Sequence, residues 1–254
     1  MQATSQKGVP HRVVLVTGAA RRIGADIARC LHAAGCDLAL HYRSAEDDMA
    51  ALVDELEQRR AGSVLALRAD LAEFDRLPEL IARAVGRFGH LDGLVNNASG
   101  FRSTPLGHIT PADWDELMGA NARAPLFLSQ AAAPHLRAAR GAIVNLVDVY
   151  AERPLPGHSV YCMAKAALVM ATRALALELG PEVRVNAVAP GAILWPEAPG
   201  GGGAAARDGM LARTPLERIG TPMEVAEAVR WLLFDATYCT GQVIAVDGGR
   251  LVAG

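Results

Sequence analysis

The sequence predicts one doubly wound α/β domain, in which a parallel sheet of about seven strands carries helices on both faces. Two observations predict this fold class. Short apolar runs rich in valine, leucine and isoleucine alternate with longer segments of helical periodicity, as in consecutive βαβ units. No linker-like change in composition interrupts residues 11–254, so we expect a single domain after a flexible leader, residues 1–10.

The predicted strands are short runs in which apolar residues are nearly continuous, which is typical of parallel strands covered on both faces. In chain order they are residues 12–18, 36–43, 63–71, 91–99, 141–148, 183–191 and 241–249. A helical segment separates each strand from the next, and this spacing favours parallel over antiparallel pairing.

The helical segments show an apolar residue every three or four positions and recognisable ends. They are residues 23–35, 45–60, 77–89, 110–136, 159–180 and 221–234. Thr110 is a typical N-cap, and Thr221 with Glu224 forms a capping-box pattern. Gly35 and Gly180 lie where helices commonly end.

The composition is that of a soluble globular protein, with 51% hydrophobic and 20% charged residues among 254. A formal charge of −2 gives no general attraction to nucleic acid or an anionic membrane. We find no charge-free apolar run of about 18 residues and no secretory-type leader, so we expect a cytoplasmic protein outside the membrane. The four cysteines form no CxxC pair and the seven histidines show no metal-ligand spacing, so we predict no metal site.

A glycine-rich segment, "TGAARRIG" at residues 17–24, lies between the first predicted strand and helix. Gly18 permits a sharp turn, Gly24 allows close packing of helix on sheet, and the helix N-terminus offers N–H groups to a pyrophosphate. This placement predicts a Rossmann-type dinucleotide site. Arg22 stands where a middle glycine is common, and its guanidinium suits a phosphate or a ligand; the alternative is a solvent-exposed arginine.

The end of the second predicted strand indicates which dinucleotide is bound. An NAD site usually has an acidic residue there, whereas this chain has His41, Tyr42, Arg43 and Ser44. Arg43 and Ser44 suit a 2′-phosphate, so we predict NADPH as the cofactor. Asp70 is placed to accept a hydrogen bond from the adenine amine, or alternatively to cap a helix over residues 71–74.

Lys165 is the only lysine apart from Lys7 in a chain that otherwise uses arginine. It follows Tyr161 by four residues, so the two side chains share one face of the predicted helix. An ammonium beside a phenol favours the phenolate, so we expect Lys165 to lower the pKa of Tyr161 toward that of a useful acid–base group. Lys165 also suits the hydroxyls of a nicotinamide ribose.

Together the motifs "TGAARRIG", "NNAS", "YCMAK" and "APG" resemble those of the short-chain dehydrogenase/reductase family over nearly the whole chain. The chain is similar in particular to the pteridine reductase branch, through Arg22, the segment from His41 to Ser44, Ser99 with Phe101, and Asp148. Asp148 precedes Tyr161 by 13 residues, where most of the family has a catalytic serine. "HYRS" is one residue shorter than in some members of that branch, and the Gly-rich segment at 195–209 is peculiar to this chain.

The resemblance implies roles for further residues and a homotetramer whose dimer faces are the helices from Thr110 and Ser159. Asn121 is expected to support the lysine through water, and Asn97 and the Pro190–Gly191 pair to line the cofactor. Ser99, Arg22 and Phe101 are expected to hold a pterin, with Phe101 covering the ring. The cofactor-binding set that we predict is Gly18, Arg22, Ile23, His41, Arg43, Ser44, Asp70, Leu71, Asn97, Ala98, Lys165, Pro190 and Gly191.

An aspartate in place of serine cannot donate a hydrogen bond to a carbonyl while ionised, but it accepts from ring N–H groups or relays a proton through Tyr161. We therefore expect NADPH-dependent reduction of pterins or dihydrofolate, with Asp148, Tyr161, Lys165 and Asn121 as catalytic residues. The alternatives are a general carbonyl or 3-oxoacyl-thioester reductase and a non-catalytic NADP(H) sensor. Residues 195–209, which contain four consecutive glycines, are interpreted as a substrate lid, or alternatively as an exposed crossover.

Overall fold

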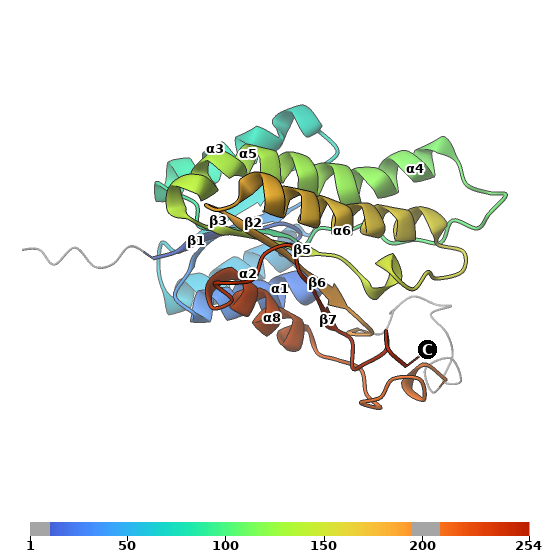
Figure 1. Cartoon of the computed structure of the whole chain (residues 1–254). Helices are drawn as coiled ribbons and strands as arrows, with labels where there is room; N and C mark the ends of the chain where they lie inside the picture. The colour runs from blue at the N-terminus through green and yellow to red at the C-terminus, as the bar shows by residue number, and fades with distance from the viewer. Residues whose placement is uncertain (1–10, 195–208, 254) are drawn as a thin grey trace, which may run out of the picture.

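A computed structural model describes residues 11–194 and 209–253, so the predicted leader and nearly all of the predicted lid lie outside the described residues. The chain forms a seven-stranded sheet in the order β3-β2-β1-β4-β5-β6-β7. Each neighbouring pair is parallel. The predicted fold class is confirmed (Figure 1).

The strands coincide with the centres of the predicted apolar runs and are shorter than those runs. They are β1 Val13–Val16, β2 Asp37–Tyr42, β3 Val64–Arg68, β4 Gly93–Asn96, β5 Ala142–Leu146, β6 Arg184–Pro190 and β7 Val243–Val246. The strand order reverses between β1 and β4, and open α/β sheets bind ligands at the carboxyl ends of the strands beside such a reversal.

The helices cover both faces of the sheet in two layers, with α3, α5 and α6 on one face and α1, α2 and α8 on the other (Figure 1). Their bounds are α1 Arg22–Ala33, α2 Glu46–Arg59, α3 Leu77–Phe88, α4 Pro111–Met118, α5 Ala124–Ala139, α6 Ser159–Leu179 and α8 Pro222–Phe234. Thr110 and Thr221 each form the complete capping box, with Asp113 and Glu224 as the reciprocal partners.

One predicted helix is interrupted in the structure. Residues 110–136 were expected as a single α-helix, but a π-helical turn, Gly119–Arg123, separates α4 from α5. π turns occur chiefly as local insertions at functional sites, because the wider turn redirects side chains. Here the turn contains Asn121, which is fully buried.

α6 is long and apolar enough to cross a membrane by length and composition, although it carries Lys165 and Arg173. More than half of its most apolar window is buried inside the protein. Its inner face packs on the sheet through residues such as Leu175 and Leu179. These properties are those of the core helix of a globular domain.

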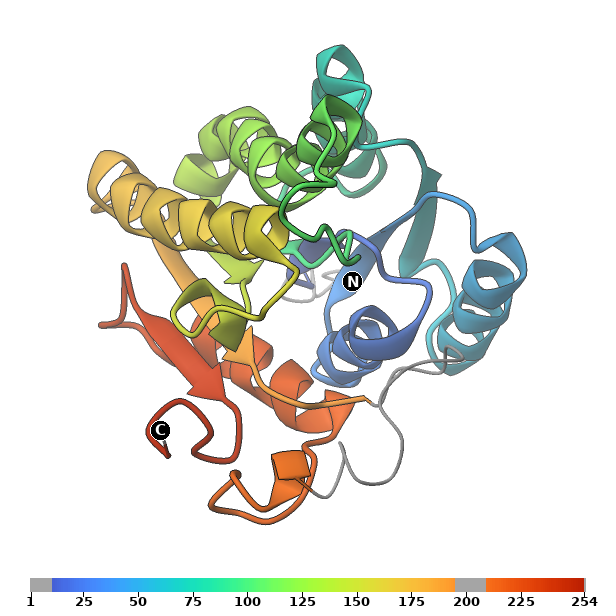
Figure 2. The same cartoon turned by 90° about the vertical axis from the view of Figure 1, so that its right-hand side faces the viewer.

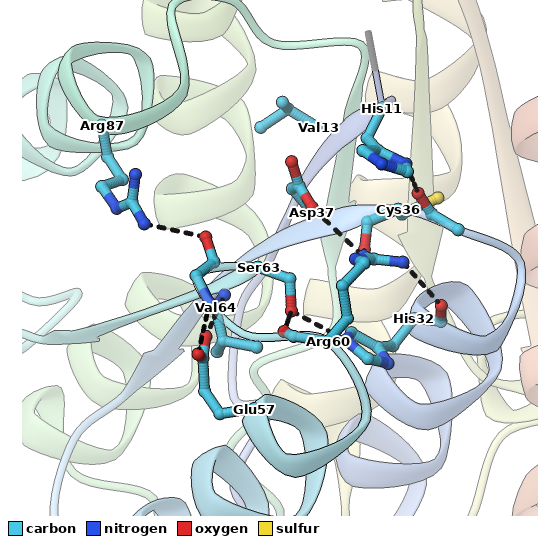
Figure 3. Close-up of polar contacts among 12 residues, drawn as sticks. His11, Val13, His32, Cys36, Asp37, Glu57, Arg60, Ser63, Val64 and Arg87 are labelled. Carbon is cyan, nitrogen blue, oxygen red and sulfur yellow. Dashed lines mark hydrogen bonds and ion pairs between the residues drawn. The ribbon is translucent and has the colours of Figure 1, made fainter. Parts of the chain in front are cut away.

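A cluster of polar contacts joins α1, α2, β2 and β3 at the amino-terminal edge of the sheet (Figure 3). The Arg60 guanidinium donates to the Cys36 carbonyl and, at 3.1 Å, to the Asp37 carboxylate. The Ser63 hydroxyl donates to the Arg60 carbonyl at 2.6 Å, so the His32 Nε2–H is the donor in its 2.8 Å contact with Ser63. Ser63 therefore links the ends of α1 and α2 at the start of β3.

Candidate active site

The candidate site lies at the carboxyl ends of β4, β5 and β6, beside the first turns of α6. Figure 2 looks onto this edge, where the green segment after β4 runs next to the yellow start of α6. Two hydrogen bonds join these segments, because the Thr104 N–H and the Ser103 hydroxyl both donate to the Gly157 carbonyl, at 2.6 and 3.1 Å. The loop is therefore fixed against the helix that carries Tyr161.

Asp148, Tyr161 and Lys165 converge at the centre of the site. The Tyr161 hydroxyl donates to Asp148 Oδ2 at 2.7 Å. Lys165 Nζ donates to the Leu146 carbonyl at 2.9 Å and lies 5.7 Å from the centroid of the Tyr161 ring. All three side chains are largely buried, so a charge on any of them acts strongly on the other two.

The pKa values of this group are set first by burial. Burial raises the pKa of Asp148, against the hydrogen bonds from the Tyr150 N–H and the Tyr161 hydroxyl and the nearby charges, which lower it. Burial and the Asp148 carboxylate hold the pKa of Tyr161 well above its usual range. Burial lowers the pKa of Lys165 to about 8, and the charge of Asp148 opposes this shift. The expectation that Lys165 lowers the pKa of Tyr161 is therefore wrong, because burial and the closer aspartate dominate.

Ser99 and Asn121 form the wall beside Tyr161. The Ser99 hydroxyl donates to Asn121 Oδ1 at 2.7 Å, and Asn121 Nδ2 donates to the carbonyls of Gly100 and Leu117, each at 2.9 Å. The π turn thus presents Asn121 to the active-site loop, and Asn121 fixes Ser99. The predicted role of Asn121 toward Lys165 stays a prediction.

Phe101 lies at the mouth of the site, with 55% of its surface exposed. Its ring stacks on His158 at 4.8 Å with an interplanar angle of 13°, and meets the Tyr161 ring edge to face, also at 4.8 Å. His158 Nδ1 lies 2.9 Å from the Pro156 carbonyl, which holds the imidazole in place. His158 was not predicted from the sequence, although it is the N-cap of α6 and lies only three residues before Tyr161.

The glycine-rich segment forms a tight turn against the end of β4. A Cβ on Gly18 would lie 2.9 Å from Ala98 Cα, and one on Gly24 would lie 2.1 Å from the Gly18 carbonyl oxygen. Asn97 Nδ2 donates to the carbonyls of Thr17 and Gly18, at 2.9 and 3.0 Å. The backbone of this turn is thus closely packed and has no side chain at Gly18 and Gly24, which allows a pyrophosphate to approach it.

Arg22 and Ile23 open α1 directly after this turn, and Arg22 adopts a φ of 54°. This left-handed conformation explains why a glycine is common at that position, because a side chain costs roughly 1 kcal/mol or more there. The Arg22 side chain is exposed and has no hydrogen bond or ion pair to any other described residue. It is therefore available to a ligand at the N-terminus of α1.

Arg43 and Ser44 follow the last residue of β2 and are both exposed, and Arg43 has no ion-pair partner among the described residues. His41, in contrast, is 2% exposed and lies beneath the loop. The Gly18 N–H donates to His41 Nδ1, and Nε2 donates to the Ala69 carbonyl, both at 3.2 Å. His41 therefore supports the glycine-rich turn, with both ring nitrogens bonded to backbone groups. Its predicted contact with the cofactor stays a prediction.

His41 is expected to make the protein sensitive to acid. Burial lowers its pKa from 6.5 to about 4, so the unfolded chain takes up this proton before the folded protein does. The contribution of His41 to the free energy of unfolding is therefore fully present above pH 6.5 and is lost as the pH falls toward 4. The loss is about 3 kcal/mol, at 1.36 kcal/mol per pH unit. Urea unfolding of wild type and His41→Gln at neutral pH and near pH 4 measures this loss.

The matched control for that measurement is His108→Gln, at an exposed position. We expect the His41 variant to flatten the acid-induced loss of stability and the His108 variant to leave it unchanged. Equal acid sensitivity in wild type and His41→Gln would contradict the assignment.

The remaining predicted cofactor residues lie along the same edge of the sheet. Asp70 Oδ1 accepts from the Ala72 N–H at 2.9 Å, and a 3₁₀ turn follows at Phe74–Arg76, so Asp70 forms a turn and caps no α-helix over 71–74. Leu71 is buried. Pro190 ends β6, and the Gly191 N–H donates to the Val246 carbonyl at 3.0 Å.

The comparisons with known proteins agree with this architecture. A family model described as enoyl-(acyl carrier protein) reductase matches residues 18–250. The chain therefore belongs to the short-chain dehydrogenase/reductase family, and it is an oxidoreductase of that family. No metal-type cluster of His, Cys, Asp or Glu occurs among the described residues.

Relatives with different named activities are about equally similar to this chain. The 3-oxoacyl-[acyl-carrier-protein] reductase of Staphylococcus epidermidis is 35% identical, over 94% of this chain and 98% of its own length. Pteridine reductase 1 of Leishmania tarentolae is also 35% identical, over 93% and 95%. The ketoacyl reductase 2 of the granaticin polyketide synthase from Streptomyces violaceoruber is 39% identical, over 93% and 95%. Overall identity therefore does not distinguish a pterin from a ketoacyl substrate.

Proposed function

We propose that this protein is an NADPH-dependent reductase of pterins, which converts a dihydropterin, an oxidised pterin or dihydrofolate to the tetrahydro form. One observation carries the proposal: the acceptor 2.7 Å from the Tyr161 hydroxyl is the carboxylate of Asp148, and not a hydroxyl group. A carboxylate accepts hydrogen bonds from the amino and ring N–H groups of a pterin, whereas a ketone offers it no donor.

NADPH, when bound, supplies the hydride. The bare turn at Gly18 and Gly24 and the exposed side chains of Arg43 and Ser44 fit a dinucleotide with a 2′-phosphate. Lys165 would bind its nicotinamide ribose hydroxyls. This choice of NADPH over NADH rests on the absence of an acidic residue among residues 41–44 and on the Arg43 guanidinium, which has no ion-pair partner in the described parts of the chain.

Tyr161 and Asp148 supply the proton in this proposal. Tyr161 is a neutral phenol, the form that can donate a proton to a ring nitrogen, although its raised pKa makes it a weak acid. Burial, which raises the pKa of Asp148, lets that carboxyl take up a proton from solvent and return it to Tyr161. Lys165 would offset the negative charge that remains on the pair after each transfer.

Ser99, Phe101 and Arg22 would hold the substrate. Ser99 and the exposed Arg22 can hydrogen-bond the polar edges of a pterin, and the Phe101 ring, stacked on His158, provides a flat apolar surface for its face. The described parts of the site therefore offer a flat aromatic surface together with side chains that can hydrogen-bond the edges of a ring.

The second candidate is a 3-oxoacyl-thioester reductase, which the similarity to ketoacyl reductases favours. Asp148 argues against it, because an ionised carboxylate beside Tyr161 offers the substrate carbonyl oxygen no second hydrogen-bond donor, and its charge opposes the negative charge that develops on that oxygen. Asp148 thus separates the two functions by chemistry where overall identity does not.

The test is the variant Asp148→Ser, assayed by the loss of NADPH absorbance with dihydrobiopterin, dihydrofolate and an acetoacetyl thioester. We expect wild type to reduce a pterin, and the serine variant to lose pterin turnover by roughly two orders of magnitude, the usual effect of losing acid–base assistance. The same variant should gain thioester turnover. Asp115→Ser, at an exposed position in α4, is the matched control and should behave as wild type.

The results separate the two functions. If wild type reduces the thioester and no pterin, the pterin proposal is wrong and the second candidate stands. If none of the three substrates is turned over while NADPH still binds in a fluorescence titration, the pterin proposal is wrong, and the result favours the cofactor-binding sensor over both reductases.

We also propose that the protein is a cytoplasmic homotetramer. The outer face of α6 carries Met163, Met170 and Leu177, which are 51, 60 and 86% exposed and lie seven residues apart. Leu126 and Phe127 on neighbouring α5 are also about two-fifths exposed. Such an apolar face suits burial against a second copy, and light scattering coupled to gel filtration would reveal a monomer if this is wrong.

A further inference from the structure

A chain of buried polar side chains crosses the core beneath the candidate active site. Asn96 on β4, Asn145 on β5 and Thr172 on α6 are each at most 2% exposed. Asn96 Nδ2 donates to Asn145 Oδ1 at 2.8 Å, and Asn145 Nδ2 donates to Thr172 Oγ1 at 2.9 Å. The Thr172 hydroxyl donates a hydrogen bond to the Leu168 carbonyl at 2.8 Å.

The direction of every bond in this chain is fixed, because each donor meets a group that can only accept there. Thr172 uses its one proton on the Leu168 carbonyl and so must accept from Asn145, which in turn must accept from Asn96. One relative position of β4, β5 and α6 satisfies all three bonds. Sliding α6 along β5 by one residue would break the central bond and leave a buried amide unpaired.

The hydrogen-bonded series adjoins functional groups at both of its ends, Thr172 and Asn96. Thr172 follows Lys165 by seven residues, about two helical turns, so the two side chains lie on the same face of α6. Asn145 immediately precedes Leu146, whose carbonyl accepts from Lys165 Nζ at 2.9 Å. Asn96 immediately precedes Asn97, whose amide holds the carbonyls of Thr17 and Gly18 in the glycine-rich turn.

A contribution to stability does not by itself account for this hydrogen-bonded series of buried side chains. Buried polar groups cost free energy unless they are fully paired, and apolar residues of similar size fill a core at least as well. Asn96 Oδ1 in fact has no hydrogen-bond partner among the described residues. The best-attested use of such groups is to specify one register between packed elements.

We propose that Asn145 and Thr172 are positioning residues, which fix α6 on β5 so that Lys165 Nζ is held at the Leu146 carbonyl, within reach of Tyr161 and the cofactor ribose. This role of Asn145 and Thr172 is the same for either substrate, because Lys165 serves the pterin and the thioester reactions alike. The two residues would thus contribute to catalysis without touching the reacting atoms.

The test compares Thr172→Val, which has nearly the same shape without the hydroxyl, with Thr172→Ser, which keeps it. We expect the valine variant to lower kcat by about tenfold or more through misplacement of Lys165, and to displace the alkaline limb of the pH–rate profile. The serine variant should retain both properties. The assay uses whichever of dihydrobiopterin or an acetoacetyl thioester wild type reduces.

A second readout needs no substrate. In the valine variant we expect faster amide hydrogen exchange across 161–172 in the protein without cofactor, and wild-type exchange in the serine variant. Should the valine variant fail to fold, Asn145→Ser, which shortens the same link, takes its place. A valine variant with wild-type kcat, pH profile and exchange, or one that only melts at lower temperature, would overturn the proposal.

Discussion

Tyr161→Phe is expected to lower kcat by about two to four orders of magnitude, the range that loss of a positioned acid–base group usually costs. The substitution removes only the hydroxyl that donates to Asp148 Oδ2 at 2.7 Å. The ring remains, so its edge-to-face contact with Phe101 should persist and the fold should be intact. Single-turnover kinetics with NADPH would measure the loss in the chemical step, while the Kd for NADPH should change little.

Tyr150→Phe is the matched control for this prediction. Tyr150 lies two residues from Asp148, but its hydroxyl contacts the Arg250 guanidinium at 3.4 Å and not the carboxylate. We expect nearly wild-type kcat in this variant. A Tyr161→Phe enzyme that keeps more than about a tenth of wild-type kcat would show that the proton comes from another group.

Lys165→Arg is expected to lower kcat/KM by roughly a hundredfold or more, the scale of a misplaced catalytic group, although the charge is retained. Lys165 is 2% exposed, and its slot fits one ammonium beside the Leu146 carbonyl. A guanidinium is larger and planar and directs its donors in a fixed fork, so it cannot occupy the same place without displacing Tyr161. Lys165→Met keeps the length without the charge and should weaken NADPH binding as well.

The same lysine predicts the alkaline side of the pH–rate profile. Burial lowers its pKa to about 8, so the ammonium is present below that pH and is lost as the pH rises through it. We expect kcat/KM to fall tenfold per pH unit above this point in wild type, as for loss of one essential proton. The limb should disappear in Lys165→Met. A rate independent of pH through this region in wild type would contradict the role.

Most of the fold could be predicted because parallel strands buried on both faces read as continuous apolar runs. The apolar run at 91–99 is longer than the strand it contains, β4 at Gly93–Asn96. β4 ends at Asn96, because Asn97 and Ala98 turn aside to bind Thr17, and only the three-dimensional structure shows that contact. Local signals were accurate where the partner is local, as in the capping boxes at Thr110 and Thr221.

The site was predicted less completely, because its properties depend on distances through space. The i, i+4 spacing places Lys165 and Tyr161 on one helix face, but the closer partner of Tyr161 is Asp148, from another element. That contact and burial reverse the expected direction of the pKa shift of Tyr161. His158 was missed for a related reason, since its importance comes from stacking on Phe101, which lies 57 positions earlier in the chain.

Because of the π turn at Gly119–Arg123, the geometry of the site depends on the exact number of residues in this part of the helix. Each residue of an α-helix turns the chain by about 100°, so a π turn behaves as one extra residue inserted into an otherwise regular rod. Deleting one residue from this turn would restore regular helix, yet it would rotate Asn121 away from Ser99 and Gly100. The more regular helix is thus the less useful one. The effect of inserting or deleting one residue here therefore depends on where the change directs the Asn121 side chain, and not on how well it preserves the helix.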